Sequence, residues 1–269
     1  MAVVALHSAA SGLSALSTEL DVLSNNLANV NTTGFKAQRA NFESLLYQHK
    51  AQPGVENLNG DMRPAGIEVG LGTRIANTQS DFEIGAPVQT GQDLDFFIEG
   101  EGFFQVDIRD DVGEGIGYTR AGNFFKNRDG DLVLGNSDGP RLIPPITVPE
   151  DATSVEVSQD GTVFAFLQNQ VEPDEIGQLE LATFVNKGGL QRIGGTLFVE
   201  SVASGPPITG EPAEGQFGGI LQGTLENSNV DPVKELVSLI KTQRAFELNS
   251  QTVQAADETL QQISNLRRF

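Results

Sequence analysis

The residues with the greatest chemical potential in this sequence are two histidines. His7 and His49 are the only imidazoles, and there are no cysteines. His7 falls on a predicted helix and His49 lies beyond it, so we expect neither to act as a general base or a metal ligand. The missing cysteines exclude disulfides, thiolate metal sites and cysteine nucleophiles.

A short acidic run is the second candidate for chemistry: Asp93, Asp95, Glu99 and Glu101. Carboxylates at close spacing occur in glycosidases and in calcium sites. These four alternate around a predicted strand and its turn, and the spacing of a calcium loop is missing. Gly100-Glu101-Gly102 is not a phosphate loop, because no helix is predicted after it. The sequence therefore predicts no catalytic residue, no cofactor and no metal site, and we expect a protein that is not an enzyme.

Charge is unevenly distributed along the chain. The net charge of −19 argues against binding to nucleic acid or to an anionic membrane surface. Residues 1–50 and 231–269 are each electrically balanced, whereas residues 81–175 contain 20 acidic and five basic residues. The start of the chain lacks a basic segment followed by an apolar run, and no stretch has the length of a membrane span, so we expect neither a cleaved signal peptide nor membrane insertion. Neutral ends can pack closely, while the acidic middle favours solvent or a basic partner.

The first thirty residues carry a heptad pattern. Two series of apolar residues recur every seven positions: Leu6, Leu13, Leu20 and Leu27 form one, and Ala9, Leu16, Leu23 and Val30 form the other. This pattern predicts a helix with a coiled-coil seam. The helix is expected to end at Thr32-Thr33-Gly34, where β-branched residues and a glycine follow.

A second helix is predicted near the end of the chain. Asp231 and Pro232 are a favourable N-cap and first helical residue. Apolar residues again recur every seven positions, but Thr242 and Asn249 make this stripe more polar. Its apolar members are Leu239, Phe246, Val253 and Leu260, with Leu236, Ala256 and Ile263 beside them. An isolated helix of this length is marginal in water, so each helix is expected to pack against a partner.

Between the helices the hydrophobic period changes to two. Asp-Gly turns at Asp129-Gly130 and Asp160-Gly161 predict two hairpins. Ile98, Phe104, Val106 and Ile108 are expected to share one face of a strand pair. The predicted fold class is α+β: discontinuous terminal helices form a coiled-coil core, with a mainly antiparallel β middle domain and an extended arm. The predicted parts are an N-terminal helix (1–35), an arm or linker (36–90), a β-rich domain (91–204), a return linker (205–224) and a C-terminal helix (225–269).

Four segments, in order along the chain, carry a resemblance to a known family. Residues 24–48 (SNNLANVNTTGFKAQRANFESLLYQ), 98–106 (IEGEGFFQV), 118–133 (YTRAGNFFKNRDGDLV) and 225–266 resemble the bacterial flagellar rod and hook proteins. Within that family, residues 42–54 and 63–74 resemble the branch that forms the distal rod. A proximal-rod or hook relative is the first alternative. A secreted fibre or adhesin with a helical stalk, and a rod-associated peptidoglycan hydrolase, are alternatives of other classes.

The resemblance implies a structural subunit that polymerises helically into a hollow drive shaft and forms part of the export channel. It implies a location in the basal body, in a rod that spans the periplasm. The implied partners are further copies of the chain, proximal rod and hook subunits, the bushing rings and the flagellar type III export apparatus. By the same resemblance, residues 42–74 would bridge neighbouring subunits and stiffen the rod. The charge of the acidic middle suggests a hydrated surface that faces the rings; alternatively, it is only a solvated surface without such a role.

The predicted contacts between subunits combine both helical stripes with the asparagines that follow the first one. The asparagine amides would fix the register between subunits; alternatively, they only end the helix and build a turn. The predicted interface residues are Leu6, Leu13, Leu16, Leu20, Leu23, Asn25, Asn26, Leu27, Asn29, Val30, Asn31, Leu236, Leu239, Phe246, Asn249, Val253, Leu260 and Ile263.

Overall fold

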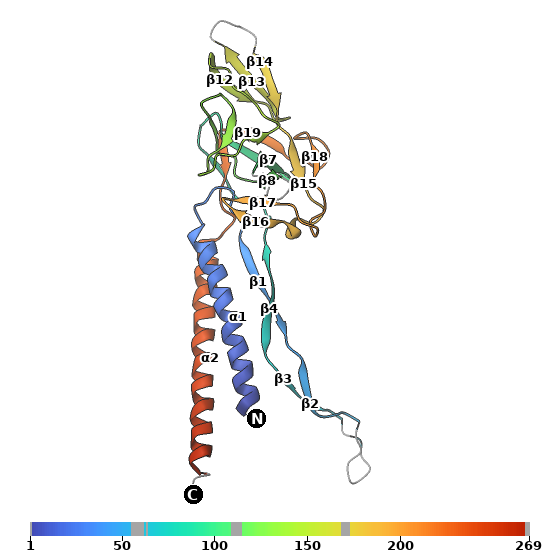
Figure 1. Cartoon of the computed structure of the whole chain (residues 1–269), viewed down its shortest axis with the longest axis vertical. Coiled ribbons are helices and arrows are strands. Elements are labelled where there is room, and N and C mark those ends of the chain that lie inside the picture. Colours follow the sequence, from blue (N-terminus) through green and yellow to red (C-terminus); the bar gives the residue numbers. More distant parts are fainter. Residues whose placement is uncertain (1, 55–61, 63, 109–114, 168–172, 267–269) are drawn as a thin grey trace. The chain divides into compact units, whose positions relative to one another are not determined.

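The computed structural model describes residues 2–54, 62, 64–108, 115–167 and 173–266 (Figure 1). The chain divides into two compact units. The first, here called the helix–ribbon unit, consists of Met1–Ala28, Gln38–Gln79 and Asp231–Phe269. The second, the β unit, consists of Asn29–Ala37 and Ser80–Val230. The β unit is thus inserted into the helix–ribbon unit, and each is described by itself below.

Two helices dominate the helix–ribbon unit. Helix α1 (Ala2–Ala28) packs along helix α2 (Pro232–Leu266). The pairing is antiparallel: Gly12 lies against Asn249, whereas Asn26, about four turns further along α1, bonds to Glu235. The predicted start of the second helix is confirmed: the Asp231 carboxylate accepts hydrogen bonds from the amides of Val233 and Lys234 at 3.0 and 3.2 Å.

A two-stranded antiparallel ribbon completes this unit. Strand β1 (Gln38–Ser44) pairs with β4 (Thr73–Ser80), and β2 (Tyr47–Ala51) pairs with β3 (Ile67–Gly70). The turn between β3 and β4 docks on α1, where the Ser8 hydroxyl donates to the Gly70 carbonyl at 3.3 Å and the Ser11 hydroxyl accepts from the Thr73 amide at 3.3 Å. Gly72 between them has φ +120°, and a side chain there would overlap with Ser11. Helix α1 therefore packs against both α2 and the ribbon.

The β unit is built from short, mainly antiparallel strands. Its largest sheet has seven strands, in the order β16-β17-β8-β7-β15-β18 with β11 beside β7. A three-stranded sheet, β12-β13-β14, and three two-stranded pairs, β9-β10, β6-β19 and β5-β20, make up the rest. The strands are β5 (Pro87–Gln89), β6 (Phe96–Glu99), β7 (Phe103–Asp107), β8 (Ile116–Thr119), β9 (Phe124–Lys126), β10 (Leu132–Leu134), β11 (Leu142–Ile143), β12 (Ala152–Val157), β13 (Thr162–Leu167), β14 (Asp174–Gln178), β15 (Leu181–Thr183), β16 (Gln191–Gly194), β17 (Leu197–Val199), β18 (Ile208–Gly210), β19 (Gly219–Gln222) and β20 (Thr224–Glu226), with a 3₁₀ turn, η2 (Lys187–Gly189).

Two hydrophobic clusters fill the β unit. The larger one joins Phe96, Ile98, Phe104 and Val106 to side chains from the β9-β10 pair and from the three-stranded sheet, among others. The smaller one lies on the opposite side of β7, because neighbouring residues of a strand point to opposite faces. It contains Phe103, Tyr118, Ala182, Phe184, Leu190 and Phe198, whose rings meet edge to face, with Tyr118 and Phe184 4.8 Å apart.

The α+β class, the two terminal helices and the mainly antiparallel middle are confirmed. Both predicted hairpins are present as β9-β10 and β12-β13. None of the helices in the described part of the chain is long and apolar enough to span a bilayer.

Three sequence predictions about the elements were wrong. The first helix ends at Ala28, before Val30, because the chain turns into the β unit there. Ile98 does not pair with the strand that follows it: β6 pairs with β19, and the left-handed glycines Gly100 and Gly102 separate it from β7. The predicted return linker contains the strands β18 and β19, which complete sheets of the β unit.

Candidate assembly surface and a buried polar network

The contact face of α1 is lined by small residues. Its buried residues are Ala9, Gly12, Ala15, Val22, Leu23 and Asn26. At Gly12 an added Cβ would lie 3.4 Å from the Asn249 amide nitrogen, so the two helices approach closely at this point. Two neighbours, α2 and the ribbon, crowd this face, and small side chains let both approach.

The leucines of the first heptad series lie beside this face rather than in its centre, whereas Ala9 and Leu23 of the second series are buried in it. Gly12, Glu19 and Asn26 form one line along the contact face. Leu13, Leu20 and Leu27 are the next residues in the sequence, and successive residues of a helix point about 100° apart, so these leucines lie at the edge of the face. They remain half-exposed. The leucine stripe is therefore only partly used within the chain.

The packing face of α2 is polar, as Thr242 and Asn249 led us to expect. Thr242 is the one α2 residue that is fully buried among those whose side chains the structure describes, and Asn249 is half-buried. An apolar patch lies on the other side of the helix and consists of Val233, Leu236, Val237 and Ile240, with exposed fractions of 46–69%. We call these four residues the α2 patch. About half or more of each of these side chains is therefore uncovered in the described part of the helix–ribbon unit.

The predicted interface residues thus fall into three groups. Leu23 and Asn26 are buried within the chain. Half-buried are Leu6, Leu13, Leu16, Leu20, Leu27, Asn29, Val30, Leu239, Asn249, Val253 and Leu260. Exposed are Asn25, Asn31, Leu236 and Phe246. The side chain of Ile263 lies outside the described residues.

Asn26 is used within the helix–ribbon unit. Its side chain donates to the Gln38 carbonyl at 2.7 Å and accepts from the Gln38 amide at 2.9 Å. The Asn26 side chain thus bonds to both the N–H and the C=O of Gln38, which are the groups that a neighbouring strand would pair with in a sheet. Asn26 ties the start of the ribbon to the end of α1, in addition to its bond with Glu235.

Glu235 occupies a polar but incompletely paired position in the first turn of α2. Burial raises the pKa of its carboxyl, and the nearby negative charge of Asp231 acts in the same direction, whereas the hydrogen bond from Asn26 opposes them. One carboxylate oxygen is buried without a hydrogen-bond partner. The protonated form of Glu235 is therefore favoured in the folded chain more than in the unfolded chain.

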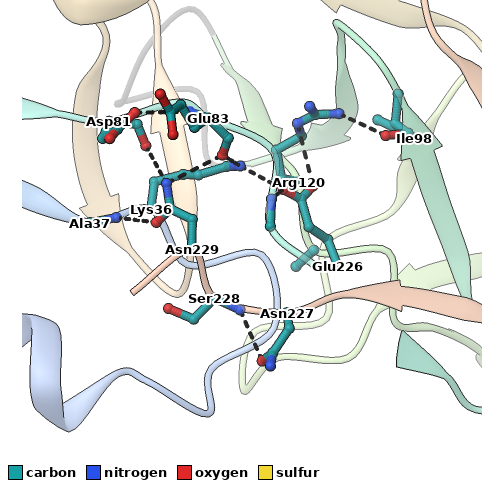
Figure 2. A network of polar contacts seen from close by, with 12 residues as sticks. Lys36, Ala37, Asp81, Glu83, Ile98, Arg120, Glu226, Asn227, Ser228 and Asn229 are labelled. Carbon is teal, nitrogen blue, oxygen red and sulfur yellow. Dashed lines mark hydrogen bonds and ion pairs between the residues drawn. The ribbon is translucent and has the colours of Figure 1, made fainter. Parts of the chain in front are cut away.

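The β unit contains a buried ionic group centred on Glu226 (Figure 2). The side chains of Lys36, Arg120 and Glu226 are 0%, 3% and 1% exposed. Glu226 Oε1 accepts from Lys36 Nζ at 2.5 Å and from the Gly85 amide at 2.8 Å, and its Oε2 lies 3.5 Å from Arg120 Nε. Burial lowers the pKa of both Lys36 and Arg120, while the Glu226 carboxylate acts in the opposite direction.

The remaining donors of this group reach backbone carbonyls. Lys36 Nζ donates to the Glu83 carbonyl at 2.7 Å, and Arg120 donates to the carbonyls of Ile98 and Gly100 at 3.4 and 2.6 Å. Each cation thus bonds to a chain segment other than its own, as the dashed lines of Figure 2 show for Lys36, Arg120 and Ile98. A buried charge needs such partners to be tolerated.

Asn229 adds a second, uncharged junction beside it. Its side-chain oxygen accepts from the Ala37 amide at 2.7 Å, and its nitrogen donates to the carbonyls of Asp81 and Glu83 at 2.9 and 3.2 Å. The Asp81 amide in turn donates to the Ala37 carbonyl at 2.8 Å. Three distant segments of the chain are thereby connected.

Arg192 supports the same region from β16. Its guanidinium lies between the rings of Phe35 and Phe198, 5.2 Å from each centroid. It donates to the Ser80 hydroxyl at 3.2 Å and to the Lys36 carbonyl. Burial lowers its pKa to about 10.

Sequence reasoning did not find this network. The signal was present: the β unit has 25 acidic and only eight basic residues, and two of those eight, Lys36 and Arg120, are embedded in apolar segments (TGFKA and YTRAGNFF). A rare cation between apolar neighbours is a candidate for burial with a counter-ion. The identity of its partner could not be inferred, because Lys36 and Glu226 are 190 residues apart.

The residues first considered for chemistry do not converge. His7 contacts the Leu71 carbonyl at 3.1 Å, and His49 pairs with Glu68 on the ribbon at 3.0 Å. Asp95 accepts from the Thr90 hydroxyl, and Glu101 pairs with Lys187. Within the described ranges, no group of three or more His, Asp or Glu side chains is placed to hold a metal ion.

Comparison with known proteins gives matches along most of the chain. Three family models match: "Flagella basal body rod protein" at residues 6–36, "Flagellar hook protein FlgE/F/G D1 domain" at residues 97–165 and "Flagellar basal body rod FlgEFG protein C-terminal" at residues 221–266. The flagellar basal-body rod protein FlgG of Caulobacter vibrioides is 43% identical over 264 residues, 98% of this chain and 99% of that protein. The chain belongs to the flagellar basal-body rod family.

Other relatives indicate the branch of this rod family. The FlgG proteins of Agrobacterium fabrum and Borreliella burgdorferi are 42% and 41% identical and cover 94% and 98% of the chain, with 95% and 98% of their own lengths. The hook protein FlgE of Salmonella typhimurium is 40% identical over 119 residues only, which is 44% of this chain and 29% of that protein. The chain is therefore a structural subunit of the distal rod in the flagellar basal body, and not an enzyme.

Proposed function

We propose that this subunit polymerises helically into a hollow shaft through its two terminal helices. The observation that carries the proposal is the α2 patch, which leaves Val233, Leu236, Val237 and Ile240 exposed on the side of α2 away from α1. The half-exposed leucines of α1 offer a second apolar stripe. Covering the remaining exposed half of each patch residue contributes about 1 kcal/mol, or about 4 kcal/mol for the patch. A further copy of the chain is the proposed occupant.

Within this assembly the predicted interface residues have different roles. The half-buried leucines and exposed Leu236 and Phe246 would meet a neighbouring coiled-coil layer, which lines the export channel and passes torque from motor to hook. Asn25, Asn29 and Asn31 would contribute polar contacts that fix the register. Asn26 is assigned to the chain's own fold instead, because both its polar atoms are used there.

The ribbon is proposed as the arm that bridges neighbouring subunits and stiffens the shaft. It exposes Phe42, Leu46, Tyr47 and Ile67. A two-stranded ribbon is marginally stable alone, so covering these side chains in the polymer would stabilise it. The turn between β3 and β4, in the middle of the ribbon, is already held to α1 by Ser8 and Ser11.

The β unit is proposed to face the bushing rings. Residues 142–186 contain no lysine or arginine, and Glu150, Asp151, Glu156 and Asp160 are exposed there. A hydrated surface of one sign discourages adhesion to the ring wall. Replacing these acids with their amides should increase friction, and unchanged rotation and ring assembly would contradict this part of the proposal. Proximal rod and hook subunits are the proposed neighbours along the axis, and export through the type III apparatus without a cleaved signal peptide is the proposed route to the periplasm.

Electron microscopy of the purified protein tests the central proposal. We expect straight tubes from the full chain and none from a deletion of residues 1–30. The double variant Leu236→Glu, Ile240→Glu should also fail to form tubes, because it places two charges in the α2 patch. Val202→Glu is the matched control, since Val202 is fully exposed in the β unit. Tubes formed equally well by the deletion or by the double variant would refute the role of the helices.

A further inference from the structure

The chain passes between its two units four times, after residues 28, 37, 79 and 230. Force that is carried along the chain from one unit to the other therefore passes through the ends of the β unit. Three of these ends are the segments 34–37, 80–86 and 226–230. The buried ionic group and Asn229 belong to these segments, with Arg120 as the one contributor from elsewhere (Figure 2).

Each of the three segments is bonded to the other two. Segment 226–230 binds segment 34–37 through the Lys36–Glu226 ion pair and through the Gly34 amide, which donates to the Glu226 carbonyl at 2.8 Å. It binds segment 80–86 through the Gly85 amide and through the Asn227 amide, which donates to the Ala86 carbonyl at 3.0 Å. Lys36 joins segment 34–37 to segment 80–86 through the Glu83 carbonyl, which also accepts from the Asn229 side chain of segment 226–230.

The geometry leaves little room for rearrangement. A side chain at Gly85 would lie 2.0 Å from the Asn227 carbonyl oxygen, and one at Gly34, which has φ +66°, would lie 2.4 Å from the Ala121 nitrogen. The segments are therefore packed backbone to backbone, and the ion pair is enclosed between them.

An ionic group in such a place needs a reason other than stability. Buried ion pairs are often no more stabilising than apolar side chains of the same size, because desolvation offsets the attraction. What the hydrogen bonds of this group add is direction, because each is lost steeply when its donor and acceptor separate or rotate. Two of the eight basic residues of the β unit are buried in this group, although the unit is strongly acidic overall.

We propose that Lys36, Glu226, Arg120 and Asn229 form a mechanical clamp that joins the entering and leaving segments of the β unit. Load on one segment is then shared by all three, and no single segment is pulled out alone. These are positioning residues for torque transmission, so the role of the clamp rests on the proposed function. The bonds of the clamp lie within a single chain, so its mechanical strength can be measured whether or not the chain polymerises.

Single-molecule pulling on the full chain tests the clamp. The chain has no cysteines, so Val233→Cys and Glu156→Cys provide two unique handles on exposed residues, one in each unit. Glu226→Gln keeps the shape but removes the carboxylate that lies between the buried cations Lys36 and Arg120. Glu43→Gln is the control, because it breaks an exposed ion pair with Arg74 on the ribbon. We expect Glu226→Gln to rupture at a lower force than the same double-cysteine chain without it, and Glu43→Gln to rupture at the same force as that chain.

Hydrogen exchange separates a clamp from general stability. In Glu226→Gln the amides of Gly34, Gly85 and Asn227 should exchange about 100-fold faster, while those of the larger core, such as Leu132, keep their protection. Asn229→Ala should increase exchange at the same amides by a smaller factor. Because this variant leaves no buried charge unpaired, it is the second test variant if Glu226→Gln does not fold. A rupture force equal to that of Glu43→Gln, or a uniform loss of protection across the β unit, would overturn the proposal. Neither measurement requires tubes, so failure of polymerisation is a separate result.

Discussion

Asn26→Ala should separate the ribbon from the end of α1. The variant removes two hydrogen bonds, at 2.7 and 2.9 Å, and leaves both backbone groups of Gln38 without their partner. An orphaned buried polar group costs about 1–3 kcal/mol. Gln38 is half-buried, so water replaces part of the loss, and we expect a total of about 2–3 kcal/mol. The cavity left by the side chain is small by comparison.

Hydrogen exchange and urea unfolding of the same variant measure this effect. The Gln38 amide should lose protection selectively, and the free energy of unfolding of the helix–ribbon unit should fall by the stated amount. Asn26→Asp gives a finer test, because a carboxylate accepts from the Gln38 amide but cannot donate to its carbonyl. Amide protection should then survive, while the destabilisation should grow as the pH rises and the carboxyl ionises beside Glu235.

The control is Ser24→Ala, on the exposed side of the same helix, which should change stability by no more than about 0.5 kcal/mol. If Asn26→Ala behaved like Ser24→Ala, the two-point contact with Gln38 would contribute nothing, and the reasoning would be refuted. A loss of helix without selective exposure of Gln38 would refute it equally, since it would assign Asn26 to the α1–α2 contact alone.

Three further predictions concern other contacts. Gly12→Ala should stabilise α1 by up to about 1 kcal/mol in thermal unfolding, because its Cβ reaches ordinary contact distance from Asn249, whereas Gly12→Leu should force the helices apart and lower the melting temperature. Burial raises the pKa of Glu235, so its protonated form is the one favoured by folding: this stability is fully present below the ordinary pKa of 4.5 and is lost as the pH rises through the folded value. Glu235→Gln should therefore be more stable than the parent at pH 7 and flatten the pH dependence above 4.5, and a parent whose helix content melts at one temperature throughout that range would contradict this. Arg192→Lys should destabilise the β unit by about 1–2 kcal/mol in urea unfolding, because an ammonium group cannot lie flat between Phe35 and Phe198; Arg39→Lys, on the exposed ribbon, should be neutral.

The two helices could be predicted because a seven-residue period is a local property of the sequence. The full set of α1 residues that packs against α2 and the ribbon could not be predicted in the same way. Gly12 and Ala15 line it together with Ala9 and Leu23 of the second heptad series, while the first series, which consists of leucines alone, lies beside it. The ribbon also packs on α1 beside α2, and small side chains on the contact face let both elements approach closely.

Sequence distance also explains which strands were found. Asp129-Gly130 and Asp160-Gly161 mark turns between adjacent strands, so these hairpins follow from local chemistry. The partner of β6 is β19, which lies far along the chain and within a segment rich in glycine and proline. The same separation hides the partner of Lys36. Burial of a lone cation can be inferred from its apolar neighbours, but the carboxylate that accompanies it depends on the tertiary fold.

The insertion of the β unit between α1 and α2 affects the order in which the protein can acquire its structure. Asn26 and Glu235 make contact although roughly 200 residues separate them, and contacts of such long range form late. During synthesis α1 emerges first and has no helical partner until α2 is complete. The β unit, whose contacts lie within one continuous stretch apart from residues 29–37, can fold in the interval. The surface proposed for polymerisation is then finished last, which delays self-association until the whole chain is present.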